Sequence, residues 1–334
     1  MGCQWSRLLS GNLLGARNFD QSGSEFGEIL SDFPISPTCA GGRIRSDCSR
    51  MPRPSPSDLF STDRSHVVRV DLSDDRDWLR DAPVCPLLGQ HHIAHVGVLE
   101  ARAPFEISRP DQSGTYLLAC LSGSGLVRAD GQWKQVSASQ ACLLPPFVTN
   151  AMKASGKEPW KFCWVRYRES RESSPIISAG SPVLGSYAPM PLFSAIQGLH
   201  AECVDGNLPA NQHLWVELIH SYVLKFAQPH QSDPRLWKLW RAVEESLAHA
   251  WTVDELAARA CVCREHLRRL CQVELGRSPM QHVTFLRMQR ARDLLSTTNL
   301  KVESITREIG YQSSNTFSNT FKKWVGWRPS EHRR

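Results

Sequence analysis

The chain has 334 residues, of which 41% are hydrophobic, so it is long enough to form two domains that each bury a core. No stretch approaches the roughly 18 consecutive uncharged apolar residues of a membrane-spanning helix, which excludes that class of protein. The net charge of +6 is uneven, because residues 235–334 carry 18 Lys and Arg against 10 Asp and Glu while the remainder is slightly acidic. A basic C-terminal module attracts phosphate, and nucleic acid is therefore a candidate partner.

The eleven cysteines include no CxxC pair, and the chain is much longer than the secreted domains that depend on disulfides. The closest pair, Cys261 and Cys263, lies one residue apart in a helical region, which suits neither a disulfide nor a zinc site. We expect reduced thiols, no metal, no cofactor and a cytoplasmic location.

Residues 1–58 contain ten Ser, seven Gly and five Pro and show no sustained periodicity. Such a composition buries too little apolar area to offset the entropy of ordering, which predicts a disordered tail. Met51 offers a second interpretation, in which translation starts there and the first fifty residues are not made.

Short apolar runs then follow one another at intervals of about ten residues, the spacing of an antiparallel barrel or sandwich. They cover residues 93–99, 116–121, 125–128, 141–144 and 160–165. Asp130 and Gly131 lie between two such segments and predict a tight hairpin. We predict a small jelly-roll barrel within a domain that spans residues 65–228.

Two helices with apolar faces are predicted after this barrel. The first carries Leu192, Ala195, Ile196 and Leu199 on one side, and the second aligns Leu214, Leu218, Ser221, Tyr222 and Lys225. Such stripes can pack on the barrel itself, but we favour self-association through Leu214, Leu218 and Tyr222. A polar, Pro-bounded linker over residues 229–234 then separates the second domain, residues 235–334.

The second domain begins with the signature of a helix-turn-helix unit. Thr252 and Glu255 form a predicted capping box ahead of a short helix, and a second helix starts at Arg264. On that second helix Glu265, Arg268 and Arg269 point away from the partner helix, where a major groove of DNA can be reached. Gly276 ends the helix, and a second capping box, Ser278 to Gln281, opens a long helix.

The same design repeats about fifty residues later. Ser314, Asn315 and Asn319 take the outward positions of the second recognition helix, while Phe317 and Phe321 face inward. A rigid helix between the two units can place the recognition helices about one duplex turn, roughly 34 Å, apart. Arg suits guanine and Asn suits adenine, so we expect the first helix to dominate sequence reading.

At these residues the chain resembles the DNA-binding domain of AraC/XylS-type transcription regulators. The resemblance rests on TVDELA at 252–257, RRL at 268–270, LGRSP at 275–279, RARDLL at 290–295, IGY at 309–311, FSNTFKK at 317–323 and RPS at 328–330. It implies a regulator of bacterial transcription, located in the cytoplasm and nucleoid, that binds double-stranded DNA and activates through RNA polymerase. Cys263, Cys271 and Lys301 depart from the family pattern, which weakens caps and packing by about 1 kcal/mol each.

The upstream half is similar to the cupin-like sensor of the arabinose-responsive branch, through RP at 109–110, GSG at 123–125, LLPP at 143–146 and WKFCWV at 160–165. The resemblance implies that Arg109 binds a hydroxyl of a small polar effector, with a sugar favoured, and that Trp164 stacks on it. Met152 and Phe162 replace polar pocket residues, which disfavours arabinose itself. The expected fold class is therefore α+β, with a cupin-like β-barrel sensor, dimerisation helices and an all-α domain of two helix-turn-helix units.

Two other functions compete with an effector-responsive regulator. A cupin-type metal enzyme would use His91, His92 or His95, but such a site needs two His that alternate on one strand, and no HxH occurs. The other is a repressor that binds DNA without a ligand. We expect a regulator that is not an enzyme.

Overall fold

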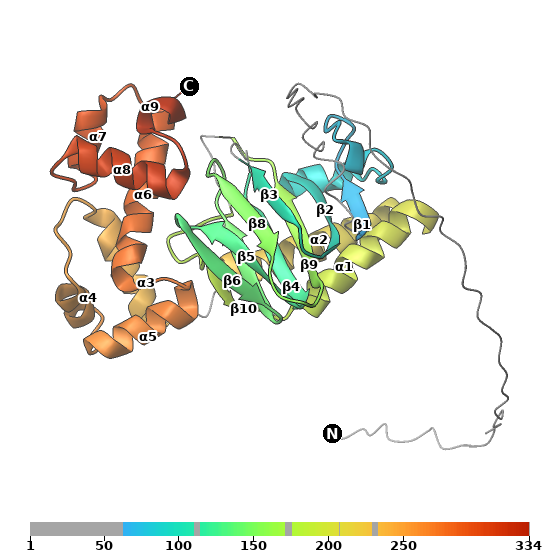
Figure 1. Ribbon diagram of the computed structural model, residues 1–334, viewed down its shortest axis with the longest axis horizontal. Coiled ribbons are helices and arrows are strands. Elements are labelled where there is room, and N and C mark those ends of the chain that lie inside the picture. The colour runs from blue at the N-terminus through green and yellow to red at the C-terminus, as the bar shows by residue number, and fades with distance from the viewer. Residues whose placement is uncertain (1–62, 110–113, 171–175, 207, 229–232, 334) are drawn as a thin grey trace, which may run out of the picture. The chain divides into compact units, whose positions relative to one another are not determined.

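The computed structural model describes residues 63–109, 114–170, 176–206, 208–228 and 233–333, and the predicted tail over residues 1–58 lies outside them (Figure 1). The first half of the described chain is rich in β-strands and the second half is helical. The strands are Asp63–Arg69 (β1), Ile93–Ala101 (β2), Glu106–Arg109 (β3), Tyr116–Ser122 (β4), Ser124–Ala129 (β5), Gln132–Ser137 (β6), Gln140–Leu144 (β7), Asn150–Ala154 (β8), Trp160–Tyr167 (β9) and Leu184–Ser186 (β10).

The strands form two antiparallel sheets, with the orders β1-β2-β9-β4-β7-β10 and β3-β8-β5-β6. Strands β5 and β6 are joined at Asp130 and Gly131, which have φ of 54° and 70° as a tight hairpin requires. The predicted antiparallel β-rich sensor domain is confirmed.

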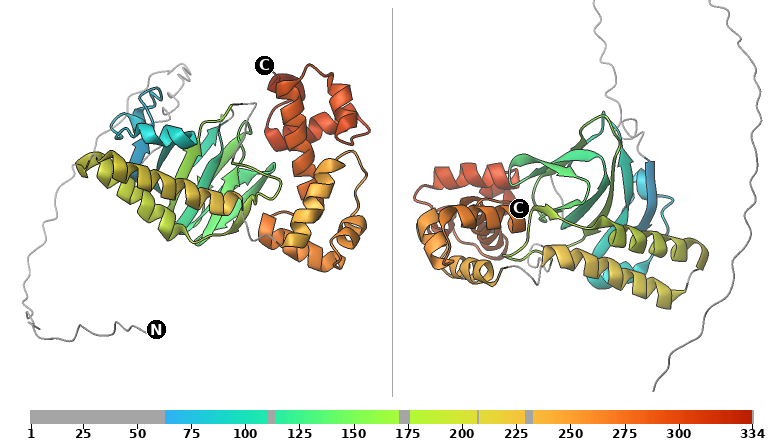
Figure 2. Two further views of the ribbon diagram at one scale, coloured as in Figure 1. Left: turned by 180° about the vertical axis from the view of Figure 1, so that it is seen from behind. Right: turned by 90° about the horizontal axis from the view of Figure 1, so that it is seen from below.

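Alternation along the strands of the larger sheet sends side chains into two separate cores. Leu118 and Phe162 point into the space between the two sheets, whereas Leu117 and Val165 point to the opposite face. That opposite face is covered by two helices, Pro189–Ala201 (α1) and Pro209–Ala227 (α2), which lie side by side along it (Figure 2).

The two covering helices use their apolar faces differently from one another. On α1, Leu192, Ile196 and Leu199 are buried in the core beneath the sheet, so the predicted stripe is core. On α2, the buried positions are Val216, Ile219 and Val223, together with Phe226 and Ala227. Leu214 and Leu218 of the predicted dimerisation stripe lie on a different side of that helix, while Tyr222 packs against the core.

The C-terminal domain contains the helices Pro234–Glu245 (α3), Val253–Arg259 (α4), Arg264–Leu275 (α5), Pro279–Thr297 (α6), Val302–Glu308 (α7), Ser314–Val325 (α8) and Pro329–His332 (α9). Two helix pairs, α4 with α5 and α7 with α8, are joined by α6, which confirms the predicted pair of helix-turn-helix units. Helix α6 contributes Val283 and Leu286 to the core of the first unit, and Ala291 and Leu295 to the core of the second.

Local sequence sets where these helices begin and end. Thr252 and Ser278 both accept backbone N–H groups in complete capping boxes, with Glu255 and Gln281 reaching back. Gly276 follows α5 with φ of 66°, and Gly326 follows α8 with φ of 109°. Within the described part of the chain, no helix is both long and apolar enough to cross a membrane.

Candidate functional site

The first candidate DNA-reading surface is the outer face of α5. Glu265, Arg268 and Arg269 are exposed there, while Leu267 and Cys271 on the opposite side are fully buried. The exposed side chains are loosely held, since Arg268 Nη1 lies 3.8 Å from Glu265 Oε2. Arg269 keeps its guanidinium beside the ring of His266, at 3.2 Å from Nδ1. Both guanidinium groups can therefore leave these neighbours for an acceptor on DNA.

The second candidate surface is the outer face of α8. Asn315 and Asn319 are exposed and Ser314 is half-buried, whereas Phe317 and Phe321 are fully buried, in the orientation expected from the sequence. The N-cap, Ser313, accepts from the backbone N–H of Thr316 and fixes the start of the helix.

The face of α8 extends into a surface hollow that the sequence interpretation did not include. Its lining adds Ser318, Lys322, Arg328 and Ser330 to the two asparagines. Lys322 lies three residues after Asn319, so the same helix face carries short amides followed by a cation. Amides suit base edges, and a Lys or Arg suits phosphate. The position of Lys322, one helical turn after Asn319, was the sequence signal that could have identified it as a DNA contact.

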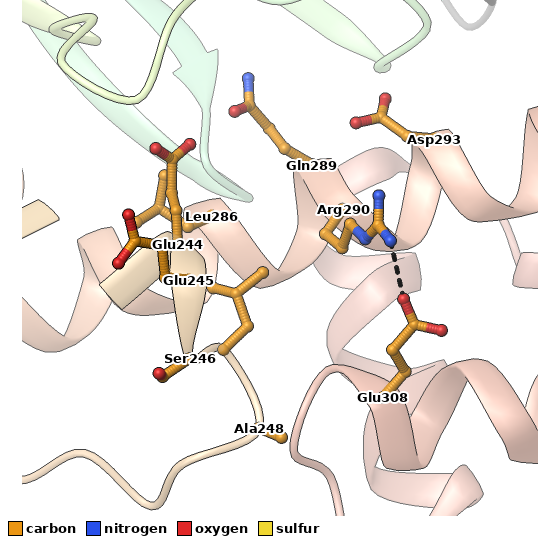
Figure 3. Close-up of a pocket in the computed structure, with 10 residues that line it drawn as sticks. Glu244, Glu245, Ser246, Ala248, Leu286, Gln289, Arg290, Asp293 and Glu308 are labelled. Carbon is orange, nitrogen blue, oxygen red and sulfur yellow. Dashed lines mark hydrogen bonds and ion pairs between the residues drawn. The ribbon is translucent and has the colours of Figure 1, made fainter. Parts of the chain in front are cut away.

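The two surfaces are held in one frame by arginines of α6. Arg287 donates from Nε to the carbonyl of Leu247 at 3.0 Å and from Nη2 to that of His249 at 2.7 Å, which ties α6 to the first unit. Arg290 Nη2 lies 2.9 Å from Glu308 Oε1 of α7, which ties α6 to the second unit (Figure 3). The connecting helix is therefore bound near its middle to both units, and it also packs in both of their cores.

An acidic hollow lies beside these contacts of α6, on a face of the domain that is unsuited to DNA. Figure 3 shows Glu244, Glu245, Asp293 and Glu308 around it, with Arg290 paired to Glu308. Burial raises the pKa of Glu244, and the neighbouring Glu245 raises it further. A phosphate backbone would meet repulsion from these carboxylates, unlike at the outer faces of α5 and α8.

The residues predicted to bind an effector lie around a buried histidine in the sensor domain. Trp164 is 3% exposed and donates from Nε1 to Nδ1 of His95 at 2.9 Å. Arg109 lies over the ring of Tyr116, with its Cζ 5.2 Å from the ring centre. Burial lowers the pKa of His95 well below its ordinary value, and nearby positive charges, Arg109 among them, lower it further. Gly97 lies opposite Trp164 on β2, and a Cβ there would come within 2.6 Å of the indole. The sheet thus makes room for Trp164 against the barrel interior.

The histidines considered for a metal site have other contacts. His91 Nε2 lies 2.6 Å from Glu217 Oε1 and its ring stacks on His220, while His95 is bound to Trp164. Across the described residues, no group of three or more His, Cys, Asp or Glu is arranged to hold a metal ion. The three histidines therefore do not form a shared ligand set.

The predicted dimerisation stripe on α2 is accessible. Leu214 is 61% exposed and Leu218 is 41% exposed, and Tyr222 one turn later is half-buried. Large apolar side chains at this spacing on one helix face form a surface that another apolar surface can cover. Leu214 and Leu218 are therefore not part of the core of their own domain, whereas Tyr222 packs against that core.

A β-rich domain followed by two helix-turn-helix units with exposed polar faces defines a two-domain DNA-binding protein. A family model described as an AraC-like ligand binding domain matches residues 94–258, and one described as a helix-turn-helix domain matches residues 256–334. The chain belongs to the AraC family of DNA-binding transcription regulators.

Individual relatives agree with this assignment. The HTH-type transcriptional regulator ArgR of Pseudomonas aeruginosa is 32% identical to this chain where the two match. The match covers 30% of this chain and only 31% of that protein. The raffinose operon regulatory protein RafR of Pediococcus pentosaceus is 24% identical, over 60% of this chain and 76% of its own length. The arabinose operon regulatory protein of Salmonella typhimurium is 25% identical, over 73% and 92% respectively. All three are regulators, so the expectation of a regulator is confirmed and the enzyme alternative is not supported.

Proposed function

We propose that this regulator is an effector-responsive transcription activator that reads two adjacent major grooves with α5 and α8. The observation that carries the proposal is that both helices expose polar faces while α6 is bound to both units by Arg287 and Arg290. A fixed separation lets one protein molecule recognise two successive grooves on the same side of DNA.

The proposed division of labour follows from the side chains on the two faces. Arg268 and Arg269 can each donate two hydrogen bonds to guanine, a contact worth about 1–3 kcal/mol of discrimination. Asn315 and Asn319 are short and uncharged, and Asn favours adenine. Lys322 and Arg328 lie beside them and suit phosphate, which supports affinity rather than sequence preference. The first recognition helix is thus proposed to contribute more specificity.

Selection of binding sites from randomised DNA at fixed salt tests this division. The variants Arg268→Ala and Arg269→Ala should lose guanine preference at defined positions, and Lys322→Ala should bind all sequences more weakly with an unchanged preference. Asn319→Ala serves as the comparison from the second helix. Unchanged preferences in both arginine variants, with loss only in Asn319→Ala, would assign the dominant reading to α8.

The sensor domain is proposed to bind a small polar effector, a sugar or sugar derivative, near Arg109 and Trp164. Three relatives bear the names of regulators of the raffinose, arabinose and lactose operons, which supports this class of effector. Binding would change transcription through contact with RNA polymerase, in the cytoplasm and on the nucleoid. A reporter driven by the bound promoter, measured with and without effector, separates this activator from a ligand-independent repressor.

The active form is proposed to be a homodimer through Leu214, Leu218 and Tyr222 of α2. The exposure of the two leucines supports this interface, because they are large apolar groups that their own domain leaves uncovered. The domain limits that we propose are residues 65–228 for the sensor, 229–234 for the linker and 235–334 for the DNA-binding domain.

A further inference from the structure

Two cysteines that lie far apart in the sequence meet in the sensor domain. Cys85 is the N-cap of a short 3₁₀ helix, Pro86–His91, in the connection between β1 and β2. Cys203 belongs to a π-helical turn, Glu202–Gly206, in the connection between α1 and α2. Both are free cysteines, and their thiols are hydrogen-bonded to one another. The fold therefore creates a thiol pair that no local sequence motif contains.

Cys85 is the fixed member of the pair. Its backbone N–H donates to the carbonyl of Arg69 in β1 at 2.8 Å. Its side chain is fully buried in the core that the large sheet forms with α1 and α2. Its Sγ also lies 3.9 Å from Oε1 of Gln212 in α2. A strand on one side and a helix on the other thus hold this sulfur in place.

Cys203 is the more accessible and adjustable member. It is half-buried against the same core, in a turn none of whose residues is fully buried. The next residue, Val204, is 56% exposed, so a small oxidant can reach the pair from this side. Two sulfurs in hydrogen-bond contact need only a small shift to reach the bond length of about 2.05 Å in a disulfide.

The surroundings of Cys85 favour its thiolate. The hydrogen bond that Cys203 donates lowers the pKa of Cys85, although burial opposes the change, and the backbone N–H groups of Leu87 and Leu88 lower it further. The same hydrogen bond raises the pKa of Cys203, which keeps its proton. Because the thiolate is the nucleophilic form of cysteine, Cys85 is the sulfur that reacts first.

Three other buried cysteines of the described chain are in the opposite situation. Burial raises the pKa of Cys142, Cys163 and Cys271 to about 12, so they remain protonated at ordinary pH. Buried thiols of this kind are unreactive. A thiolate with a second thiol beside it is, in contrast, the arrangement of cysteines that respond to oxidants.

We propose that Cys85 and Cys203 are an oxidation site, at which a peroxide converts the two thiols into an intramolecular disulfide. The sulfur of Cys85 attacks one oxygen of hydrogen peroxide, the O–O bond breaks, and a sulfenic acid and water are formed. The sulfur of Cys203 then attacks the sulfenic sulfur, whose S–O bond breaks, and the hydroxyl group leaves as a second water with the proton of Cys203. In total, two thiols lose two electrons and two protons, and one peroxide becomes two waters.

The disulfide would join the connection between β1 and β2 to the connection between α1 and α2. It closes a long loop of the chain and therefore restricts the unfolded state, so the oxidised protein should be the more stable form. Thiol reductants would reverse it, as in other disulfides that form transiently in response to oxidants. Oxidation would be a second input to this domain, and the site does not depend on the proposed effector.

Peptide mass spectrometry of the full chain tests the pair. The reduced protein is treated with a small excess of hydrogen peroxide, its remaining thiols are alkylated, and it is digested without reductant. We expect a peptide that contains Cys85 to be linked to one that contains Cys203, and the link to disappear after treatment with dithiothreitol. Absence of this link, or a link from Cys85 mainly to another cysteine, would overturn the proposal.

Variants separate the roles of the two sulfurs. Cys203→Ala should leave Cys85 as a sulfenic acid, which dimedone labels, whereas the wild type should be labelled little because the disulfide replaces that acid. Cys261→Ser is the matched control, since Cys261 is an exposed cysteine of the DNA-binding domain, and it should form the link in the same yield as the wild type. Equal labelling of Cys85 in the wild type and in Cys203→Ala would contradict the proposed role of Cys203.

Two further measurements distinguish a reactive pair from two thiols that only pack together. The pH midpoint for oxidation of Cys85 should rise in Cys203→Ala, because the hydrogen bond that lowers its pKa is lost. The oxidised wild type should melt about 5 °C or more above its reduced form, and Cys203→Ala should show no such difference. An unchanged midpoint, or a linked protein that melts no higher than the reduced one, would overturn the proposal.

Discussion

Cys263 is the N-cap of α5, the first recognition helix, and its side chain accepts no backbone hydrogen bond. Thr252, Ser278 and Ser313 all provide that bond at the starts of their helices. A hydroxyl oxygen at position 263 would satisfy one of the free N–H groups of α5, so Cys263→Ser should stabilise the protein by about 0.5–1 kcal/mol. Urea unfolding of the full chain measures the change.

Ser278→Ala is the opposite control, because it removes an existing cap and should destabilise by about 1 kcal/mol. If Cys263→Ser left the unfolding midpoint unchanged while Ser278→Ala lowered it, the N–H groups at the start of α5 would have other partners. Cys263 is exposed, so the substitution leaves the packing of the domain unchanged.

His95 makes the stability of the sensor depend on pH. Burial, followed by the charges of Arg76, Arg166, Arg109 and Arg168, lowers its pKa well below the usual value near 6.5. The unfolded chain then binds a proton that the folded protein does not, so stability is full above about pH 6.5 and falls as the pH drops below it.

The loss for one such group is at most about 1.4 kcal/mol per pH unit. His95→Gln, which retains an acceptor for Trp164, should therefore lose less stability than the wild type between pH 7 and pH 5. Denaturant melts across this range measure the slopes. Burial also lowers the pKa of His282, so part of the dependence should remain; identical slopes in the two proteins would show that His95 is protonated in the folded state.

Single residues differ in how far the sequence could predict them. The capping boxes at Thr252 and Ser278 could be predicted from the sequence, because the two residues of each box lie only three positions apart. Trp164 was singled out, but its hydrogen bond to His95 was not. That contact depends on the register between β2 and β9, which no local pattern reports.

At the scale of elements, α2 has an inner and an outer apolar face. The double variant Leu214→Asp with Leu218→Asp should convert the proposed dimer to a monomer without unfolding it, because both side chains are already exposed. Burying two carboxylates against an apolar partner would cost several kcal/mol. Sedimentation at micromolar concentration measures the change in mass.

Val216→Asp is the matched control on the same helix, since Val216 is fully buried in the core beneath the sheet. That variant should unfold the domain rather than only dissociate it. A wild-type protein that sediments as a monomer at the same concentration would contradict the dimer.

The strongly apolar strands were predictable and the polar ones were not. Runs that became β2, β4 and β9 lie at the centre of the large sheet, where both faces are covered. Strands such as Glu106–Arg109 and Gln132–Ser137 lie at the edges of the small sheet and alternate with polar residues. Helix α3 was also missed, although Leu236, Leu239, Trp240 and Val243 follow helical spacing and are buried.

At the scale of the whole molecule, α6 joins the two proposed reading surfaces, α5 and α8, in one frame. The class of protein could be predicted because motifs for both helix-turn-helix units fall in order along the last hundred residues. The identity of the proposed effector could not be predicted in the same way, because no motif along the chain specifies it.

Selection of binding sites from randomised DNA with the intact wild-type chain tests the central claim most directly. Because Arg287 and Arg290 fix α6 to both units, each bound protomer should select two clusters of preferred bases with a constant separation of roughly 10 base pairs between centres. A single cluster per protomer, or two clusters whose separation varies freely among the selected sites, would contradict the account.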